Sequence, residues 1–307
     1  MIGLRRRKFI TGGAAMALGA GTMSFARADP LGLPIGLQLY TVQDAIQRDF
    51  DGTLRKVAAI GYRAVETGLA LGGRSARDLR MIFESLGLDW KSAHINGAEL
   101  QGGLQETIDQ AHEAGLNFLV CAFPLALRRS APATLNNAAG YVMDIVRNFT
   151  LDDWKANADF FNRVGEQIKK AGLQFAYHNH NLEFRKFGDA TGYDTLLART
   201  DPALVKLELD CGWMVSAGRD PADYLTRYSD RYVMLHVKDL KQAPPNTELK
   251  MKGADLGTGI IDWPRLFAAA GKAKIAAAYV EQEPPYPQSS LQSVQADFDY
   301  LHNLKLS

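Results

Sequence analysis

The segment AGLQFAYH, residues 171–178, carries the chain directly from a helical pattern into a strand pattern. Gly172 ends the amphipathic stretch, since glycine readily adopts the backbone conformation that closes a helix. An apolar run follows at once, and the same alternation recurs from Leu33 onward. It predicts strands at residues 35–40, 64–67, 90–95, 117–123, 174–179, 205–210, 232–237 and 276–282.

Helical patterns lie between these runs. In residues 51–62, Leu54, Val57 and Ala58 form an apolar stripe at helical spacing, and Gly61 closes it. Further helices are expected at residues 75–87, 104–115, 151–172, 191–200, 221–229, 262–271 and 290–304. Strands and helices that alternate in this way, with no interdomain linker, predict an α/β fold, a single-domain (β/α)8 TIM barrel.

An open doubly wound sheet is the alternative fold. It usually carries a glycine-rich phosphate loop after its first strand. Here the first strand ends in QLYTVQD, residues 38–44, which contains no glycine. We therefore expect the barrel.

The first 28 residues differ from the rest of the chain. LRRRKFI, residues 4–10, precedes a glycine- and alanine-rich apolar stretch, and ARA, residues 26–28, is a small-x-small cleavage signal. The pair Arg6-Arg7 resembles a twin-arginine export signal, with an ordinary secretory signal or a basic tail as the alternative. We expect residues 1–28 to be removed and the barrel to span residues 29–307. The mature chain is then expected in the periplasm, after export by the twin-arginine machinery.

The charge of the mature chain narrows the possible partners. The whole chain has a formal net charge of +1, but the predicted signal contains basic and no acidic residues. Its removal leaves a mildly acidic chain, which disfavours a nucleic-acid backbone as partner. No apolar run in the remaining chain is long enough for a membrane span, so no membrane is expected after cleavage. Cys121 and Cys211 are expected to be separate free thiols.

In a barrel of this kind, the site is built from the C-terminal ends of the strands and the loops that follow. Polar residues interrupt the apolar strands at these ends: Gln38, Tyr40, Glu66, His94, His178, His180, Asp210, His236, Lys238, Glu281 and Glu283. One such residue alone is usually a core group with a hydrogen-bond partner. Their recurrence at one end of successive strands predicts a site. His178 and His180 share a face, since side chains alternate along a strand.

Four of these residues, one from each of the last four strands, form a mixed nitrogen and oxygen set: His178, Asp210, His236 and Glu281. Two imidazoles and two carboxylates suit Mn²⁺, Zn²⁺, Co²⁺ or Fe²⁺ better than Ca²⁺ or Mg²⁺, which prefer oxygen ligands. Four protein ligands leave room for substrate oxygens, which Lewis-acid catalysis requires. We expect one such divalent metal ion.

Four motifs in order resemble the sugar phosphate isomerase/epimerase family of xylose isomerase-like TIM barrels: LDCGWMVSAGRDP (209–221), YVMLHVKDL (232–240), DLGTGIIDWPRLF (255–267) and YVEQE (279–283). The resemblance covers the chain from residue 33 to its end. It implies a metal held by an acid on the fifth strand, the Asp of LD, the His of HVKD and a Glu on the eighth strand. The last three correspond to Asp210, His236 and Glu281.

The chain departs from this family pattern at two positions. His178 stands where the family carries the glutamate of the fifth strand, so the site has less negative charge. Trp213 stands where the family carries a histidine three residues after the aspartate. That histidine helps to position keto-sugars in the epimerases, so its absence puts simple C3 epimerisation in doubt.

The expected chemistry begins at a hydroxy-carbonyl unit chelated by the cation. The neighbouring C–H becomes acidic, and a nearby base removes its proton. Glu281 is the expected base, with His180, Lys238 and Glu66 as further catalytic groups. Two alternatives stay open: His180 is a hydrogen-bond partner behind the site, and Lys238 is a structural lysine paired with Asp239.

Three residues are expected to contact the substrate: Tyr40, His94 and Trp213. Trp213 is expected in the loop after the sixth strand, where its indole offers an apolar surface on which a sugar face can stack. Glu183 follows the two histidines of YHNH closely, and we expect its carboxylate to orient one of them.

These observations predict a metal-dependent isomerase or epimerase of a sugar or keto-sugar. A metal-dependent lyase or hydratase of 3-keto-glycosides is the alternative within the same chemistry, and a non-catalytic periplasmic sugar-binding protein is the alternative outside it. An exported protein seldom meets sugar phosphates, which favours an unphosphorylated substrate. Barrel nucleases that act on abasic DNA need a metal cluster and a basic groove. The mature chain is acidic, so we do not expect a nuclease.

Overall fold

The computed structural model describes residues 30–126, 146–242 and 252–306. The predicted signal peptide, residues 1–28, therefore lies outside the described residues. None of the helices in the described part of the chain combines the length and hydropathy that crossing a bilayer requires.

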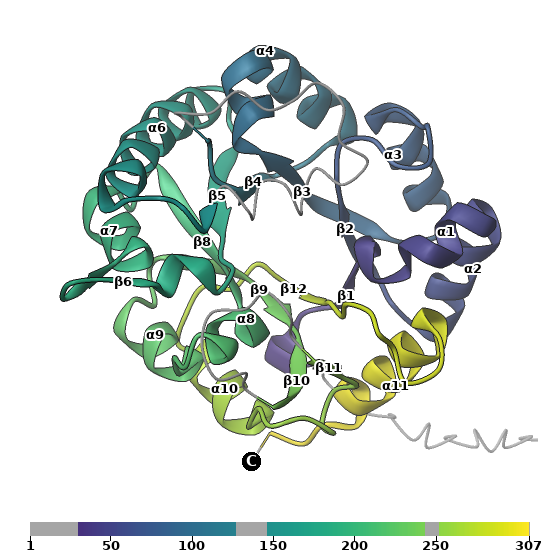
Figure 1. Ribbon diagram of the computed structural model, residues 1–307. Coiled ribbons are helices and arrows are strands. Elements are labelled where there is room, and N and C mark those ends of the chain that lie inside the picture. Colours follow the sequence, from purple (N-terminus) through teal and green to yellow (C-terminus); the bar gives the residue numbers. More distant parts are fainter. Residues whose placement is uncertain (1–29, 127–145, 243–251, 307) are drawn as a thin grey trace, which may run out of the picture.

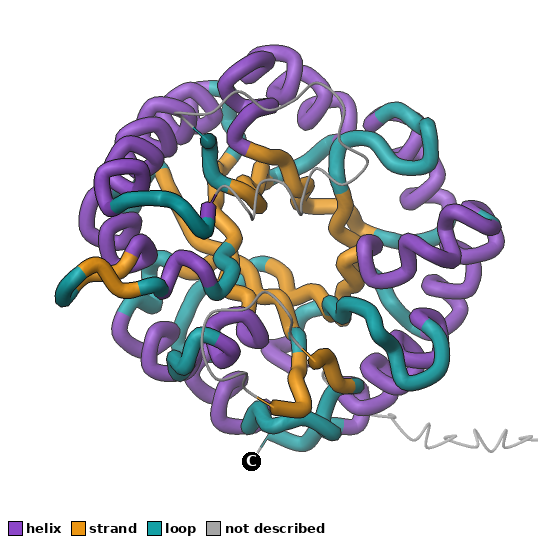
Figure 2. The backbone as a smooth tube through the Cα atoms, in the orientation of Figure 1, coloured by secondary structure: helices purple, strands orange, loops and turns teal. Residues whose placement is uncertain are grey.

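Eight parallel strands close into a barrel, and the helices surround it (Figure 1). The strands are β1 Ile35–Gln38, β2 Ala64–Thr67, β3 Asp89–Asn96, β4 Phe118–Phe123, β5 Gln174–His178, β8 Val205–Asp210, β9 Tyr232–Val237 and β12 Ala277–Val280. Each pairs with the next in this order, and β12 pairs with β1 to complete the ring (Figure 2). The predicted single-domain (β/α)8 fold is confirmed.

The long helices lie outside the strands, one layer thick: α2 Phe50–Ile60, α3 Ala76–Ser85, α4 Gly97–Ala114, α6 Leu151–Lys170, α7 Gly192–Arg199, α9 Pro221–Arg227, α10 Trp263–Ala270 and α11 Ser290–Asn303. Short elements lie in the connections: α1 Gln43–Arg48, α8 Cys211–Ser216, and the 3-10 turns η1 Pro30–Gly32, η2 Leu39–Val42 and η3 Leu182–Phe184. Two small antiparallel sheets pair β6 Lys186–Phe187 with β7 Ala190–Thr191, and β10 Asp239–Gln242 with β11 Lys252–Ala254.

Helix α4 begins well before the predicted residue 104. Asn96 starts it with a capping box, because its side chain accepts a hydrogen bond from the Glu99 N–H while the Glu99 carboxylate accepts one from the Asn96 N–H. Three glycines between residues 97 and 103 weaken the helical pattern in the sequence. The cap therefore decides where the helix starts.

Apolar side chains fill the first half of the barrel, before the polar strand ends. This layer contains Ala64, Val120, Ala176, Met234, Ala277 and Tyr279. Gly36 leaves room for the Tyr279 ring, since a Cβ at this position would lie 2.5 Å from a ring carbon. The Tyr279 hydroxyl lies 2.9 Å from Oγ of Ser92, so the tyrosine joins the apolar layer to the polar site above it. Cys121 and Cys211 are buried and free, as expected.

One ionisable group outside the site is buried where α11 packs. Asp297 is 1% exposed, and its Oδ1 accepts a hydrogen bond from the Leu256 N–H at 2.7 Å. Burial raises the pKa of this carboxyl to about 8, and the charges of Asp255 and Asp239 act in the same direction. The folded chain therefore holds a proton here at neutral pH.

We expect the Asp297→Asn variant to be more stable than the wild type at pH 8 and equally stable near pH 3. In the unfolded chain this carboxyl ionises near pH 4, whereas in the folded chain it ionises only near pH 8. Between these values the folded state binds the extra proton, so wild-type stability falls as the pH rises. The amide keeps the hydrogen bond and has no such dependence. Melting temperatures of both proteins from pH 3 to 9 test this, and parallel curves would contradict it.

Candidate active site

The structure brings the four predicted metal ligands together at the C-terminal ends of neighbouring strands. His178 and Asp210 end β5 and β8, His236 lies near the end of β9, and Glu281 follows β12. All four are buried, and one ligand atom from each lies within 4.8 Å of the others. The sequence spacing and the barrel geometry therefore agree on this group, which we call the predicted ligand set.

Asp210 has two separate tasks because its oxygens face different ways. Oδ1 caps the short helix α8, accepting a hydrogen bond from the Trp213 N–H at 2.7 Å. Oδ2 faces the site, 3.1 Å from Nζ of Lys238 and 3.9 Å from Nδ1 of His236. Burial raises the pKa of Asp210 to about 7. The cap fixes the orientation in which Oδ2 is available to a cation.

Lys238 lies among three carboxylates at the mouth of the barrel. Its Nζ is 3.1 Å from Asp210, 3.0 Å from Glu281 and 2.9 Å from Glu283, and the side chain is almost fully buried. Burial alone would lower the pKa of Lys238, but these carboxylates raise it well above its usual value. The side chain is therefore an ammonium ion that touches two members of the predicted ligand set.

The alternative that Lys238 pairs with Asp239 is wrong. The carboxylates that the Lys238 ammonium group contacts are those of Asp210, Glu281 and Glu283. The Asp239 carboxylate instead accepts hydrogen bonds from the backbone N–H groups of Leu240 and Gly257, at 2.9 and 3.1 Å. It organises the connection between β9 and α10.

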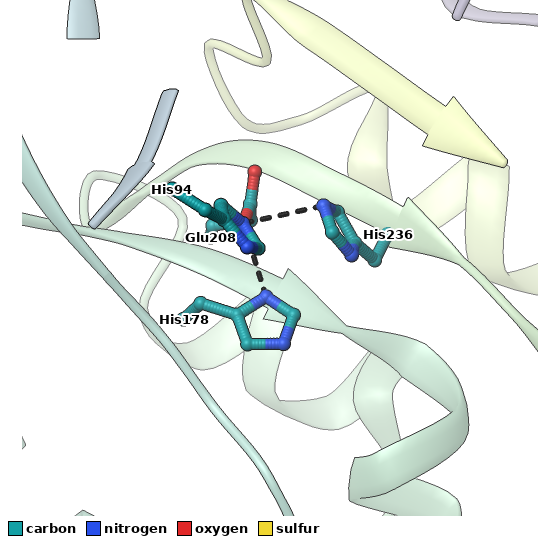
Figure 3. Close-up of side chains that lie close together, drawn as sticks. All are labelled: His94, His178, Glu208 and His236. Carbon is teal, nitrogen blue, oxygen red and sulfur yellow. Dashed lines mark hydrogen bonds and ion pairs between the residues drawn. The ribbon is translucent and has the colours of Figure 1, made fainter. Parts of the chain in front are cut away.

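Glu208 is a central residue that the sequence analysis missed. It is fully buried on β8, and its Oε2 lies 2.8 Å from Nε2 of His94, 3.0 Å from Nδ1 of His178 and 3.3 Å from Nε2 of His236 (Figure 3). The alternation in VKLELD places Glu208 on the same face as Asp210, which is the signal that could have identified it. These four residues form a second group whose ligand atoms lie within 4.8 Å of one another.

Glu66, predicted as a catalytic group, is enclosed by hydrogen-bond partners. Its Oε2 lies 2.7 Å from Nε2 of His236 and accepts a hydrogen bond from Nε2 of Gln38 at 2.9 Å. Its Oε1 accepts a hydrogen bond from Ser92. Burial would raise the pKa of Glu66, but the cationic His94 and His236 hold it well below the usual range. Glu66 is thus an ionised partner of the histidines, with no exposed surface.

His94 and Tyr40, two of the predicted substrate contacts, are the more open residues of the site. The His94 side chain is 20% exposed, and its ring stacks on that of His236 with centroids 5.2 Å apart. Burial lowers the pKa of His94, but Glu66 and Glu208 outweigh this and raise it to about 10. Tyr40 is half exposed after β1. Both residues can reach a ligand that enters the barrel.

His180 stacks on an aromatic ring inside the site. Its imidazole lies against Phe123 with ring centroids 4.9 Å apart. Burial, and next the charge of Lys238, lower the pKa of His180 to about 3, so the ring is neutral at physiological pH. A neutral imidazole can accept or donate one hydrogen bond but supplies no acidic proton of its own. His180 therefore suits substrate binding better than acid catalysis.

Glu183 acts on the backbone of the YHNH segment. Its Oε1 accepts hydrogen bonds from the His180 N–H and the Tyr177 hydroxyl, both at 2.8 Å. The distance from Oε1 to Nδ1 of His180 is 3.9 Å, which is beyond hydrogen-bond range. The expectation that Glu183 orients one of the imidazoles is wrong: it fixes the turn on which His180 stands.

The sequence predicts that Trp213 lies in a loop, but the structure places it in helix α8. The side chain is 3% exposed, and its ring centroid lies 4.9 Å from Nζ of Lys238 and 5.5 Å from the His180 ring. The indole therefore packs against the ammonium group as a cation–π partner. An open stacking surface for a sugar ring is not formed by this side chain in the structure.

The residues of the predicted ligand set fit a divalent cation. One buried carboxylate oxygen, Oε1 of Glu208, has no hydrogen-bond partner among the described residues, and Oδ2 of Asp210 faces the site with only the Lys238 ammonium group, at 3.1 Å, as a close opposite charge. Buried carboxylates are costly unless opposite charge compensates them. In addition, one ligand atom from each of the four residues lies within 4.8 Å of the others, and Nδ1 of His236 and Oε2 of Glu281 are joined by a hydrogen bond of 2.6 Å. Nitrogen and carboxylate donors together favour a transition metal over Ca²⁺ or Mg²⁺.

Comparison with known proteins gives a family and several similar folds. The model of the xylose isomerase-like TIM barrel family matches residues 54–304. An inosose dehydratase of Lacticaseibacillus casei is 27% identical over 217 residues, which cover 66% of this chain and 67% of that protein. The match thus spans about two thirds of the relative.

Two solved structures show the same fold. A sugar phosphate isomerase/epimerase from Parabacteroides distasonis ATCC 8503 superposes with a TM-score of 0.70 at 24% identity, covering 95% of this chain and 99% of the other. An IOLI protein with a bound zinc atom superposes with a TM-score of 0.65 at 14% identity, covering 88% and 98%. At these identities the likeness supports the fold alone.

Proposed function

Because this chain belongs to the xylose isomerase-like TIM barrel family, we propose that it is a divalent-cation-dependent lyase. In this proposal it removes a proton next to the carbonyl of a polyhydroxylated ketone, and a hydroxyl then leaves as water. The observation that carries the proposal is the 3.0 Å contact between the Glu281 carboxylate and the Lys238 ammonium group at the barrel mouth. It sets one base beside one acid, which is what an elimination requires. The name of the curated relatives, inosose dehydratase, supports the same reaction class.

His178, Asp210, His236 and Glu281 would hold the cation. When bound, a Mn²⁺, Zn²⁺, Co²⁺ or Fe²⁺ ion supplies Lewis-acid polarisation of the substrate carbonyl, which acidifies the neighbouring C–H. The zinc atom in one structural neighbour is consistent with this set of metals.

The chain's own groups carry the protons in this proposal. Glu281 accepts the proton from carbon, and Lys238 donates a proton to the hydroxyl that departs from the adjacent carbon. The C–H and C–O bonds break, a C=C bond forms, and water leaves. Glu281 then holds one proton more and Lys238 one fewer. Transfer across their 3.0 Å contact restores both groups without a further reactant.

The same geometry gives less support to an isomerase or epimerase. Epimerisation returns a proton to the opposite face of the carbon, which calls for a second acid/base group across the substrate. At the end of β5 the side chain is His178, which is bonded to Glu208 and almost fully buried. Trp213 replaces the histidine that helps to position keto-sugars in the epimerases. The isomerase or epimerase reading remains the second candidate, because the fold is shared with such enzymes.

Product analysis tests the proposal. Purified protein loaded with Mn²⁺, Zn²⁺ or Co²⁺ is incubated with an inosose and with a 3-keto-glycoside, with and without a chelator. We expect the inosose to give a product lighter by one water and the 3-keto-glycoside to release its glycosidic alcohol, in each case only when the cation is present. A product of unchanged mass would instead establish the isomerase or epimerase. Ligand binding with no turnover of any keto compound would favour a sugar-binding protein and overturn both.

A further inference from the structure

Glu208 contacts three imidazole rings, with hydrogen bonds to His94 and His178 and a longer ion-pair contact to His236. A single oxygen, Oε2, lies 3.0 Å from Nδ1 of His178, 3.3 Å from Nε2 of His236 and 2.8 Å from Nε2 of His94. Figure 3 shows the Glu208 carboxylate between the rings of His178 and His236. This carboxylate is fully buried.

The contact with His178 determines which nitrogen of that ring stays available to a cation. A neutral imidazole carries one N–H and one lone pair, and a carboxylate binds the N–H side. For His236, carboxylates face both nitrogens, since Nδ1 lies 2.6 Å from Glu281 and Nε2 lies 2.7 Å from Glu66, so these contacts select neither nitrogen. For His178, Glu208 faces Nδ1, which leaves Nε2 as the lone-pair nitrogen.

We propose that Glu208 is a positioning residue that selects Nε2 of His178 as the nitrogen that binds the cation. This inference rests on the cation dependence of the proposed function. It adds how the protein prepares a histidine ligand to bind the cation. The fifth-strand ligand is a histidine, and unlike a carboxylate it must be held in one tautomer and one ring orientation. Glu208 performs that task for His178 through its 3.0 Å contact with Nδ1.

The two histidines depend on Glu208 to different degrees. Nε2 of His236 also lies 2.7 Å from Oε2 of Glu66, so a second carboxylate holds that ring. Among the described residues, the hydrogen bond that holds Nδ1 of His178 is the one to Glu208. Loss of the Glu208 charge should therefore affect His178 first. Glu66→Gln provides a matched control, since it removes an equally buried carboxylate that bonds His236 and leaves the His178 contact in place.

A competing arrangement makes Glu208 a direct ligand. His94, His178, Glu208 and His236 also bring their ligand atoms within 4.8 Å. A cation there would use Nδ1 of His178 and Nε2 of His236, the nitrogens that face Glu208. A neutral imidazole has its lone pair on one side only, so the two arrangements predict opposite metal-bound nitrogens on His178. Identifying the nitrogen decides between them.

The test is NMR of protein labelled with ¹⁵N in its histidine rings, with and without Zn²⁺, together with Zn²⁺ affinity. In the metal-free wild type we expect His178 to carry its proton on Nδ1, and in the zinc-loaded protein to bind through Nε2. Glu208→Gln should lose this preference and weaken Zn²⁺ binding by about 10–100-fold, the usual effect of removing such a partner. Glu66→Gln should leave the His178 tautomer unchanged.

The wild-type measurement stands even if a variant fails to fold. A wild-type His178 protonated on Nε2, or zinc bound through Nδ1, would overturn the proposal. So would a folded Glu208→Gln protein with unchanged tautomer and Zn²⁺ affinity. None of these readouts uses a substrate. Zinc bound through Nε2 without turnover of any keto compound would therefore defeat the proposed function and leave the positioning role intact.

Discussion

Replacing Glu281 by glutamine is expected to lower turnover by about 10²–10⁴-fold, the usual contribution of a positioned acid/base group. The amide oxygen can still face a cation, but the amide cannot accept the proton from carbon. The Glu281→Gln protein should therefore retain its metal and lose its rate. Turnover at saturating Mn²⁺ or Zn²⁺, together with metal content per chain, measures both effects.

Glu283→Gln is the matched control for this variant. Glu283 contacts the same lysine at 2.9 Å but lies outside the predicted ligand set. We expect a smaller loss of rate from this change. A Glu281→Gln protein with full metal content and near-normal turnover would show that another residue is the base. The neutral His180 would then be the next candidate. If the Glu281→Gln protein loses its metal, the main role of Glu281 is to bind the cation.

Replacing Asp210 is expected to abolish metal binding while the barrel stays folded. The site lies at the strand ends, and the apolar layer beneath it does not include this residue. Asp210→Asn removes the charge but can keep the hydrogen bond that caps α8, whereas Asp210→Ala removes both. Metal content should fall from one ion per chain to none in each variant, and turnover with it. Elemental analysis after dialysis measures this.

The pair of variants separates the two tasks of Asp210. Loss of the cap should make the metal-free alanine variant less stable than the asparagine variant by about 1 kcal/mol, the typical value of a helix N-cap. Denaturant unfolding of both variants without metal gives that difference. Full metal content in either variant would show that Asp210 is not a ligand.

The sequence predicted the order and type of the barrel elements because each strand is a short apolar run and each long helix has an amphipathic stripe. It placed the start of α4 too late, since a capping box at Asn96 decides that boundary. It also read Trp213 as part of a loop. There the Asp210 side chain caps a helix of six residues, which is too short to show a periodic pattern.

The candidate site could be predicted to the extent that it depends on strand ends. His178, Asp210, His236 and Glu281 were identified because parallel strands bring their C-terminal ends to one rim. Glu208 was missed because its role comes from three histidines on other strands, and their convergence is a tertiary property.

The sequence does not predict the carboxylate partners of Lys238, for a related reason. Its sequence neighbour Asp239 accepts hydrogen bonds from other groups, and two of the three carboxylates that Lys238 contacts follow β12, which pairs with β9 in the barrel. The proximity of these residues depends on strand order in space, which residue spacing along the chain does not reveal.

The proposed function depends on the breaking of a C–H bond next to a carbonyl. Turnover of a keto compound that carries deuterium at that carbon tests it most directly. The account predicts slower turnover of the deuterated substrate than of the unlabelled one, and a product that has lost the deuterium to solvent. Equal rates with a product that retains all its deuterium would contradict it.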